Sequence, residues 1–141
     1  MNEESKNILL NVLNEVRRFT IRGLSEEAYE TAFQYECKFR NIKHDRQKKF
    51  YIPYKTEGLT VLIPDFILYI GDEKIFLEFK ASKEKTRHDD QILKYMDYFQ
   101  LNEYHLFNFS TWELTTCKES KDKNNKDIID YEVIHKFENG L

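Results

Sequence analysis

Two acidic residues, Asp65 and Glu78, have a spacing that suits opposite strands of one hairpin. The dipeptide Gly71-Asp72 between them is a tight-turn sequence flanked by strand-forming residues. A two-residue turn there sets a register in which Asp65 lies directly opposite Glu78, with Cβ atoms roughly 4.5–5.5 Å apart. Lys80, two residues after Glu78, projects from the same face. A three-residue turn would separate the two acids unless a bulge intervened, whereas a four-residue turn would keep them together.

Two half-buried carboxylates that face each other repel, so they need a shared proton, a lysine or a divalent cation. Carboxylate oxygens are suitable ligands for Mg²⁺ or Mn²⁺. Lys80 beside such a metal can orient water or stabilise negative charge on a phosphoryl group. The same residues also fit a plain ion pair in which Lys80 neutralises Asp65 and Glu78. The hairpin alone leaves both interpretations open.

The hydrophobic pattern predicts a mixed α/β chain around this hairpin. Helical spacing of apolar residues predicts helices over 5–21 and 87–100. Ser25 is a suitable N-cap for a further helix that runs to about Arg40. That helix is expected to bury Ala28, Ala32, Phe33 and Cys37. Strands are expected over 50–54, 59–70, 74–81, 105–109 and 128–137, with a turn at Glu57-Gly58 and a polar loop over 118–126.

Composition narrows the class of protein. The 141 residues, 40% of them hydrophobic and 15% aromatic, suit a single domain. No apolar run is long enough for a bilayer and the first residues do not resemble a secretory signal, so we expect a cytoplasmic location. Two cysteines are too few for a disulfide framework or a zinc site. The net charge of −3 is weak evidence against nucleic-acid binding.

Basic residues nevertheless gather in two places. Residues 38–55 contain seven lysines and arginines, and Lys83, Lys85 and Arg87 follow the second strand of the hairpin. These clusters fit either a solvated face or contacts with phosphates.

Three motifs in order resemble the PD-(D/E)xK nuclease superfamily. The first is Pro64-Asp65 followed by Glu78-Phe79-Lys80. The segment Gly23–Tyr29 fits the GxxExxY signature of one small branch, and His88–Tyr95 fits the HxxQxxxY helix of that branch. The resemblance covers about residues 5–110. Residues 112–141 are interpreted as a C-terminal extension.

The resemblance implies a single domain over residues 1–141 with a restriction-endonuclease-like core. That core is a mixed sheet with a central antiparallel hairpin, flanked by helices. Mg²⁺ or Mn²⁺ would be held by Asp65, Glu78, Glu26 and the main-chain carbonyl of Phe79. Lys80 would orient the attacking water, and Gln91 and Tyr95 would complete the set of catalytic residues. For Glu26 and Tyr95, the simpler alternatives are a helix-start acid and a core aromatic.

The function implied is a metal-dependent nuclease that hydrolyses phosphodiester bonds, with DNA favoured over RNA. Substrate contacts are expected from His88, Lys48, Lys49, Lys83 and Arg87. Because many relatives dimerise, a homodimer is a further expectation. One alternative is a catalytically silent module with the nuclease fold that binds nucleic acid or a protein partner. Another is a structural or small-ligand protein in which Lys80 only neutralises the acids.

Overall fold

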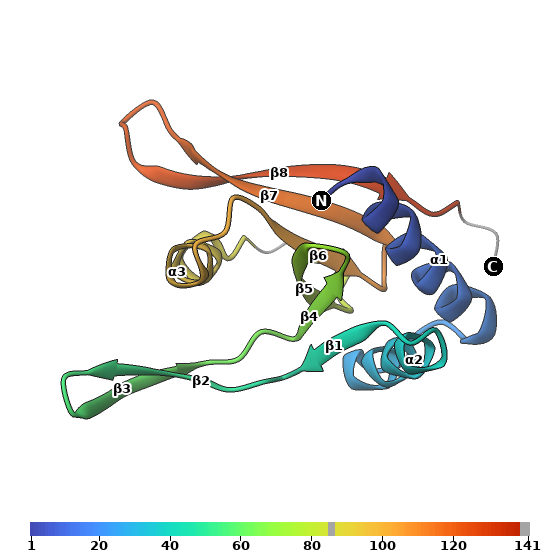
Figure 1. Cartoon of the computed structure of the whole chain (residues 1–141). Helices are drawn as coiled ribbons and strands as arrows, with labels where there is room; N and C mark the ends of the chain where they lie inside the picture. Colours follow the sequence, from blue (N-terminus) through green and yellow to red (C-terminus); the bar gives the residue numbers. More distant parts are fainter. Residues whose placement is uncertain (85–86, 139–141) are drawn as a thin grey trace.

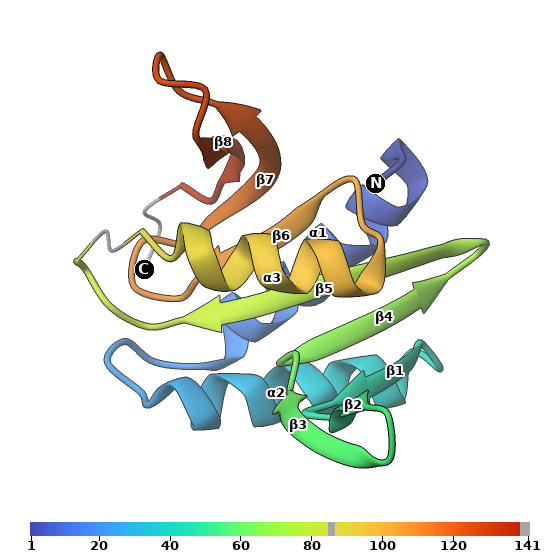
Figure 2. The same ribbon diagram turned by 90° about the vertical axis from the view of Figure 1, so that its left-hand side faces the viewer.

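The computed structural model describes residues 1–84 and 87–138 and arranges them in three layers (Figures 1 and 2). Helices α1 and α2 cover one face of a mixed sheet, and α3 lies across the other. The helices are α1 (Glu3–Phe19), α2 (Glu26–Phe39) and α3 (Asp89–Phe99). The strands are β1 (Lys43–Arg46), β2 (Phe50–Tyr54), β3 (Glu57–Leu62), β4 (Phe66–Ile70), β5 (Glu73–Lys80), β6 (Tyr104–Asn108), β7 (Glu113–Lys121) and β8 (Asp127–Lys136).

The main sheet has the strand order β1-β4-β5-β6-β7-β8. Strands β5 and β6 pair in parallel through the crossover that contains α3, and the other neighbours pair antiparallel. Strands β2 and β3 form a separate two-stranded sheet. This arrangement confirms the predicted α/β class, with an antiparallel hairpin inside a mixed sheet and helices on both faces.

The central hairpin has the predicted register. Ile70 pairs with Glu73, and the ladder continues to Phe66 opposite Leu77. Gly71 adopts a φ of 57° in the turn, a conformation that glycine reaches without steric cost. The ladder ends at the Phe66–Leu77 pair, and Asp65 lies in a bend just before β4. Its carboxylate accepts the backbone N–H of Phe79, so the direct Asp65–Glu78 pairing stays a prediction.

The predicted strand over 59–70 is wrong, because the chain leaves the sheet at residues 63–65. Pro64 has no N–H to donate to a ladder. The backbone N–H of Ile63 instead donates to the Tyr95 hydroxyl at 3.2 Å, and the Asp65 carbonyl accepts from the backbone N–H of Gln47 at 2.9 Å. The segment therefore divides into β3, in the outer hairpin, and β4, in the main sheet.

Other local predictions also need correction. The turn expected at Glu57-Gly58 lies two residues earlier, with Lys55 at a φ of 54°. The charged strand β1 was not predicted; it forms the edge of the main sheet, where charged residues oppose edge-to-edge association. Residues 118–121 belong to β7 and pair with β8, so the polar loop is shorter than expected. The β7–β8 hairpin extends beyond the core and its outer residues remain in solvent (Figure 1).

The two faces of the sheet bury separate apolar clusters. The cluster under α1 and α2 is rich in aromatic rings, with Phe33 against Phe66 and Phe79 at centroid distances of 5.1 and 4.9 Å. The cluster under α3 includes Phe76 and Tyr95 and reaches Phe50 of β2. Phe66, which follows Asp65, and Phe79, which follows Glu78, are both buried in the first cluster.

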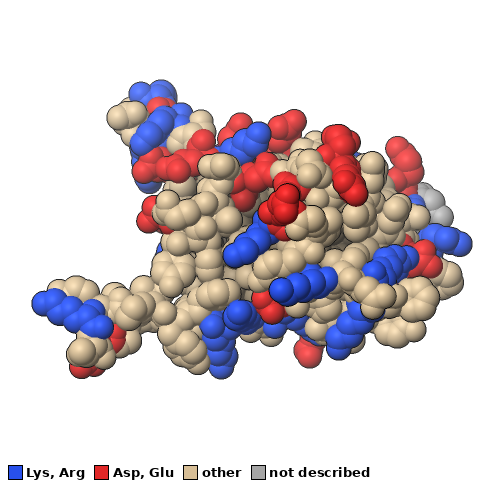
Figure 3. Space-filling view, in the orientation of Figure 1, with Lys and Arg blue, Asp and Glu red and all other residues tan. Residues whose placement is uncertain are grey.

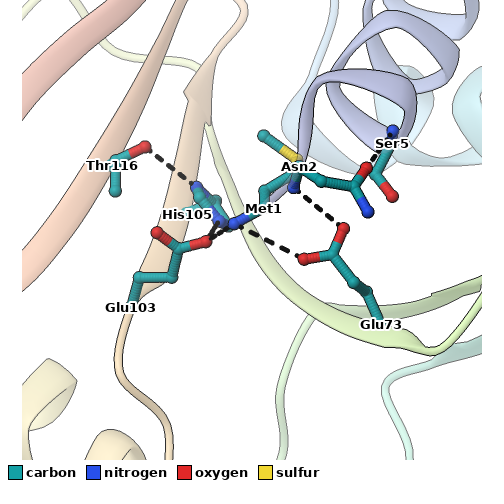
Figure 4. Close-up of polar contacts among 7 residues, drawn as sticks. All are labelled: Met1, Asn2, Ser5, Glu73, Glu103, His105 and Thr116. Carbon is teal, nitrogen blue, oxygen red and sulfur yellow. Dashed lines mark hydrogen bonds and ion pairs between the residues drawn. The ribbon is translucent and has the colours of Figure 1, made fainter.

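The start of α1 is fastened to the sheet by polar contacts (Figure 4). The Met1 nitrogen contacts the Glu103 carboxylate and lies 3.6 Å from Glu73. Glu73 also accepts the backbone N–H of Asn2 at 2.9 Å, which lowers the pKa of this carboxyl. His105 lies between Glu103 and Thr116, and burial lowers the pKa of its ring to about 4. These contacts tie α1 to β5 and β6 at the end of the molecule opposite Lys80.

Candidate metal centre

Helix α2 contributes two acids to one end of the sheet. Its N-cap, Ser25, accepts the backbone N–H of Ala28 at 3.1 Å, so the helix begins at Glu26 as predicted. Glu26 and Glu30 are one turn apart and fall on the same helical stripe as the buried Phe33. Ala28 was expected in the core but is exposed, whereas Glu30 is only 3% exposed. Burying the core face of α2 therefore also brings its acids toward the sheet.

Asp65 joins these two acids. Glu26, Glu30 and Asp65 each have one carboxylate oxygen that lies within 4.8 Å of the corresponding oxygens of the other two residues. The orientation of Asp65 is fixed because its Oδ2 accepts the backbone N–H of Phe79 at 2.9 Å. Three carboxylates at this separation can supply oxygen ligands to one hard divalent cation. Glu30 had not been singled out from the sequence.

Glu78 and Lys80 complete the charges of the site from β5. Glu78 is 7% exposed, and its pKa is raised to about 7, first by burial and then by the charges of Asp65 and Glu26. The Lys80 ammonium opposes that shift. Glu78 does not belong to the group of three oxygens within 4.8 Å, but its charge acts on the same acids. The structure therefore brings the sequence-predicted Asp65, Glu78, Lys80 and Glu26 into one electrostatic unit.

The electrostatics of this unit favour a bound cation. Burial and the charge of Asp65 raise the pKa of Glu30 to about 7, and the same two causes raise the pKa of Glu26. Burial also raises the pKa of Asp65, although the Phe79 N–H and the positive charges of Lys80 and Arg46 oppose this. Burial is the main cause of each shift, and neighbouring acids add to it for Glu26, Glu30 and Glu78. A divalent cation would offset the negative charge of these carboxylates.

A buried oxygen without a partner provides an independent test of fit. Among the described residues, Glu30 Oε1 and the Tyr104 hydroxyl are the buried side-chain polar atoms that lack a hydrogen-bond partner. Arg46 Nε lies 4.0 Å from Glu30 Oε1, beyond hydrogen-bond distance. Leaving a buried carboxylate oxygen unpaired is costly, and coordination to a cation would satisfy it. The residues present therefore fit a divalent metal ion.

The GxxExxY segment has a structural explanation for its outer residues. Gly23 adopts a φ of 75° in the turn between α1 and α2. The Tyr29 hydroxyl donates to the Ile21 carbonyl at 2.7 Å and accepts the backbone N–H of Leu24 at 3.4 Å. The ring of Tyr29 stacks on Phe109 at 4.6 Å. Glycine and tyrosine thus hold the turn from which Glu26 enters the site.

We expect Tyr29→Phe to lower the free energy of unfolding by about 1–2 kcal/mol, because two backbone groups of the turn lose their hydroxyl partner. Urea unfolding followed by circular dichroism measures this. Tyr35→Phe is the control, since Tyr35 lies on the same helix but is 66% exposed. Equal stability of the two variants would show that the Tyr29 hydroxyl does not stabilise the turn.

The three motif residues at helix α3, His88, Gln91 and Tyr95, lie in different environments. The hydroxyl of Tyr95, a buried residue, accepts the Ile63 N–H, so it positions the segment that leads to Asp65. His88 is the N-cap residue of α3, and its backbone N–H donates to Tyr131 at 3.2 Å. Gln91 is exposed and lines, with His88, a hollow that contains none of the four acids. The catalytic role expected of Gln91 and Tyr95 stays a prediction.

The basic residues expected at the substrate surface lie on loops around the sheet. Lys48 and Lys49 are exposed between β1 and β2, and Lys48 Nζ lies 3.9 Å from Asp45. Lys83 is exposed just after β5. Arg87 already pairs with Asp89 at 2.8 Å, whereas Lys85 lies outside the described residues.

Comparison of the sequence with models of known protein families identifies the family of this chain. A family model described as the PD-(D/E)XK nuclease superfamily matches residues 3–138. The chain belongs to the PD-(D/E)XK nuclease superfamily. The match also includes β7 and β8, which the sequence resemblance had left as an extension. No curated protein and no solved structure gave a significant match.

Membership of the PD-(D/E)XK superfamily agrees with the observed three-layer α/β fold. The superfamily typically uses a divalent metal ion, and the cluster of Glu26, Glu30 and Asp65 is a suitable acidic group for one. Nucleic acid is the partner that a nuclease superfamily implies. In the described part of the chain, no helix has both the length and the apolar character needed to cross a membrane.

Proposed function

We propose that this protein is a metal-dependent nuclease of the GxxExxY branch that hydrolyses phosphodiester bonds, with DNA as its substrate. The observation that carries the proposal is the convergence of four acids and one lysine where β4, β5 and α2 meet. Three of the acids lie within 4.8 Å of one another, and the fourth, Glu78, is buried beside them. A purely structural role does not require four acids, two of them buried, around one lysine.

In this proposal, Mg²⁺ or Mn²⁺ is held by Asp65, Glu26 and Glu30, with Glu78 and the Phe79 carbonyl completing the site. When bound, the metal would polarise the scissile phosphate and lower the pKa of a water molecule. The Phe79 N–H holds the Asp65 carboxylate in place for this purpose. Lys80 keeps its ammonium beside the acids, where it can orient water and offset charge on the phosphate.

A groove beside Lys80 offers a path for the substrate. It has a volume of about 430 Å³ and is lined by Lys80, His88 and Asn108, together with residues of β7 and β8. Figure 3 shows Lys and Arg atoms along the lower part of the molecule and at the tip of the β7–β8 hairpin, while Asp and Glu atoms gather mainly over the upper part. Lys48, Lys49 and Lys83 lie outside this groove. We infer that they contact phosphates around the site, and that binding weakens as salt increases.

The test is incubation of the purified protein with single-stranded DNA, double-stranded DNA and RNA, in EDTA and in Mg²⁺ or Mn²⁺. We expect cleavage of DNA only with the divalent ion. Calorimetric titration with Mn²⁺ helps to distinguish a metal-dependent nuclease from a nuclease-fold module that does not cleave. Mn²⁺ binding together with cleavage supports the nuclease. Nucleic-acid binding with no cleavage under any condition would instead indicate the silent nuclease-fold module, and the proposal would be wrong.

Cytoplasmic location and homodimer formation stay predictions.

A further inference from the structure

The hairpin of β2 and β3, which we call the arm (residues 50–62), extends away from the main sheet (Figure 1). One side of the arm rests on the core. The Phe50 ring meets Phe99 of α3 edge to face at 4.8 Å, and Leu62 is 1% exposed. Ile52 packs against the same cluster. The base of the arm is therefore fixed to α3 by apolar packing.

The outer part of the arm presents apolar residues to solvent. Tyr51 is 71% exposed, Tyr54 56% and Leu59 63%. Because side chains alternate along a strand, Tyr51 and Tyr54 project from opposite faces of β2. Large side chains exposed on a projecting element indicate a binding surface, because folding alone gains little from them. The aromatic character of two of these three side chains suits stacking against flat ligands.

The charge of the arm indicates which flat ligand is favoured. The arm contains one lysine, Lys55, and one acid, Glu57, and two further lysines, Lys48 and Lys49, lie directly before it. Lys55 Nζ lies 5.4 Å from the Tyr54 ring centroid, and Lys48 Nζ lies 5.4 Å from that of Phe50. Figure 3 shows basic and acidic atoms together at the end of the arm. Rings interleaved with cations match a ligand that combines bases with phosphates, whereas an apolar protein surface would not favour the lysines.

The arm also continues directly into the candidate metal site. Tyr51 pairs with Val61, and Asp65 follows Val61 by four residues. At about 3.3 Å per residue, the chain between them spans at most about 13 Å. A strand that contacts Tyr51 can therefore reach the acids after a few nucleotides.

We propose that Tyr51 and Tyr54 stack on unpaired bases and guide a single-stranded segment of nucleic acid to the acidic site. This proposal rests on the nuclease function proposed above and adds to it the structure of the substrate. Stacking on an inserted side chain requires a base whose face is free, and the bases inside a duplex stack on each other. The arm therefore favours single-stranded DNA, or the unpaired end of a duplex, over a blunt duplex.

Fluorescence anisotropy tests this with a labelled single-stranded oligonucleotide of mixed sequence and with the same sequence as a blunt duplex. The protein carries Asp65→Asn, whose amide oxygen can still accept the Phe79 N–H, so binding is measured without cleavage. We expect Tyr51→Ala combined with Tyr54→Ala to weaken single-strand binding about tenfold or more, with little change for the duplex. Tyr51→Phe combined with Tyr54→Phe should retain the affinity because the rings remain.

Tyr35→Ala is the matched control, because Tyr35 is a similarly exposed tyrosine on α2. Lys55→Gln should weaken the binding of both the single strand and the duplex, and it should reduce the salt dependence of binding. Unchanged single-strand affinity in the double alanine variant would overturn the proposal, as would an equal loss for the duplex. A change from dimer to monomer in sedimentation, with affinity unchanged, would also overturn it and identify the arm as a contact between copies. Because these measurements need no cleavage, an inactive protein would refute the nuclease function without deciding the role of the arm.

Discussion

Glu78→Gln is expected to reduce metal-dependent cleavage roughly a thousandfold or more. The substitution keeps the shape of a side chain that is 7% exposed but removes a negative charge from the group that includes Asp65 and Glu26. Losing several kcal/mol of metal-assisted stabilisation of the transition state corresponds to that factor. Initial rates at saturating Mg²⁺, compared with the parent, measure the effect.

Glu132→Gln is the control for this experiment, because Glu132 is an exposed acid on β8 of the same sheet. It should cleave like the parent. Glu30→Gln tests the residue that the structure added to the site, and a large loss is expected there too. If Glu78→Gln retained parental activity, the cleavage would come from another site or from a contaminant.

The same Glu78→Gln substitution is expected to stabilise the protein when no metal is present. The pKa of Glu78 is about 7 in the folded chain, against an ordinary value of 4.5. The folded state therefore binds more protons than the unfolded state between these values, so stability falls as the pH rises from about 4.5 to about 7. Glutamine removes this penalty. In EDTA at pH 8, we expect Tm to rise by on the order of 5 °C.

Near pH 4.5 the Tm of the parent and that of Glu78→Gln should differ little, because the Glu78 carboxyl of the parent is then protonated in the folded state. Mn²⁺ should raise the Tm of the parent more than that of Glu78→Gln. Glu73→Gln provides a control of opposite sign, since the Asn2 N–H lowers the pKa of Glu73 and its charge stabilises the fold at neutral pH. A fall in Tm for Glu78→Gln at pH 8 would contradict the assignment of buried excess charge to the site.

The features of the fold that follow from local chemistry could be predicted from the sequence. Gly71-Asp72 determines a two-residue turn, and the turn determines which residues face each other across β4 and β5. Ser25 determines where α2 begins. These signals act within a few residues of the chain. They are sufficient to predict the register of β4 and β5 from Ile70–Glu73 to Phe66–Leu77.

The features that depend on long-range packing could not be predicted in the same way. Strand β1 consists of four polar residues, and only its pairing with β4 makes it a strand. Pro64 belongs to the Pro64-Asp65 motif, but its missing N–H also ends the strand pairing of this segment. The sequence does not single out Glu30, because an acid near a helix N-terminus is expected to be exposed to solvent. Its position one turn before Phe33, on the buried stripe of α2, was the available signal.

The two hydrogen bonds on either side of Pro64 separate the motion of the arm from the geometry of catalysis. Tyr95 secures the chain at Ile63, and Gln47 secures it again at the Asp65 carbonyl. We therefore expect bending of the outer hairpin to leave the Asp65 carboxylate in place. On the proposed function, ligands of differing shape could then be held at the periphery while the spacing of the acidic oxygens stays constant.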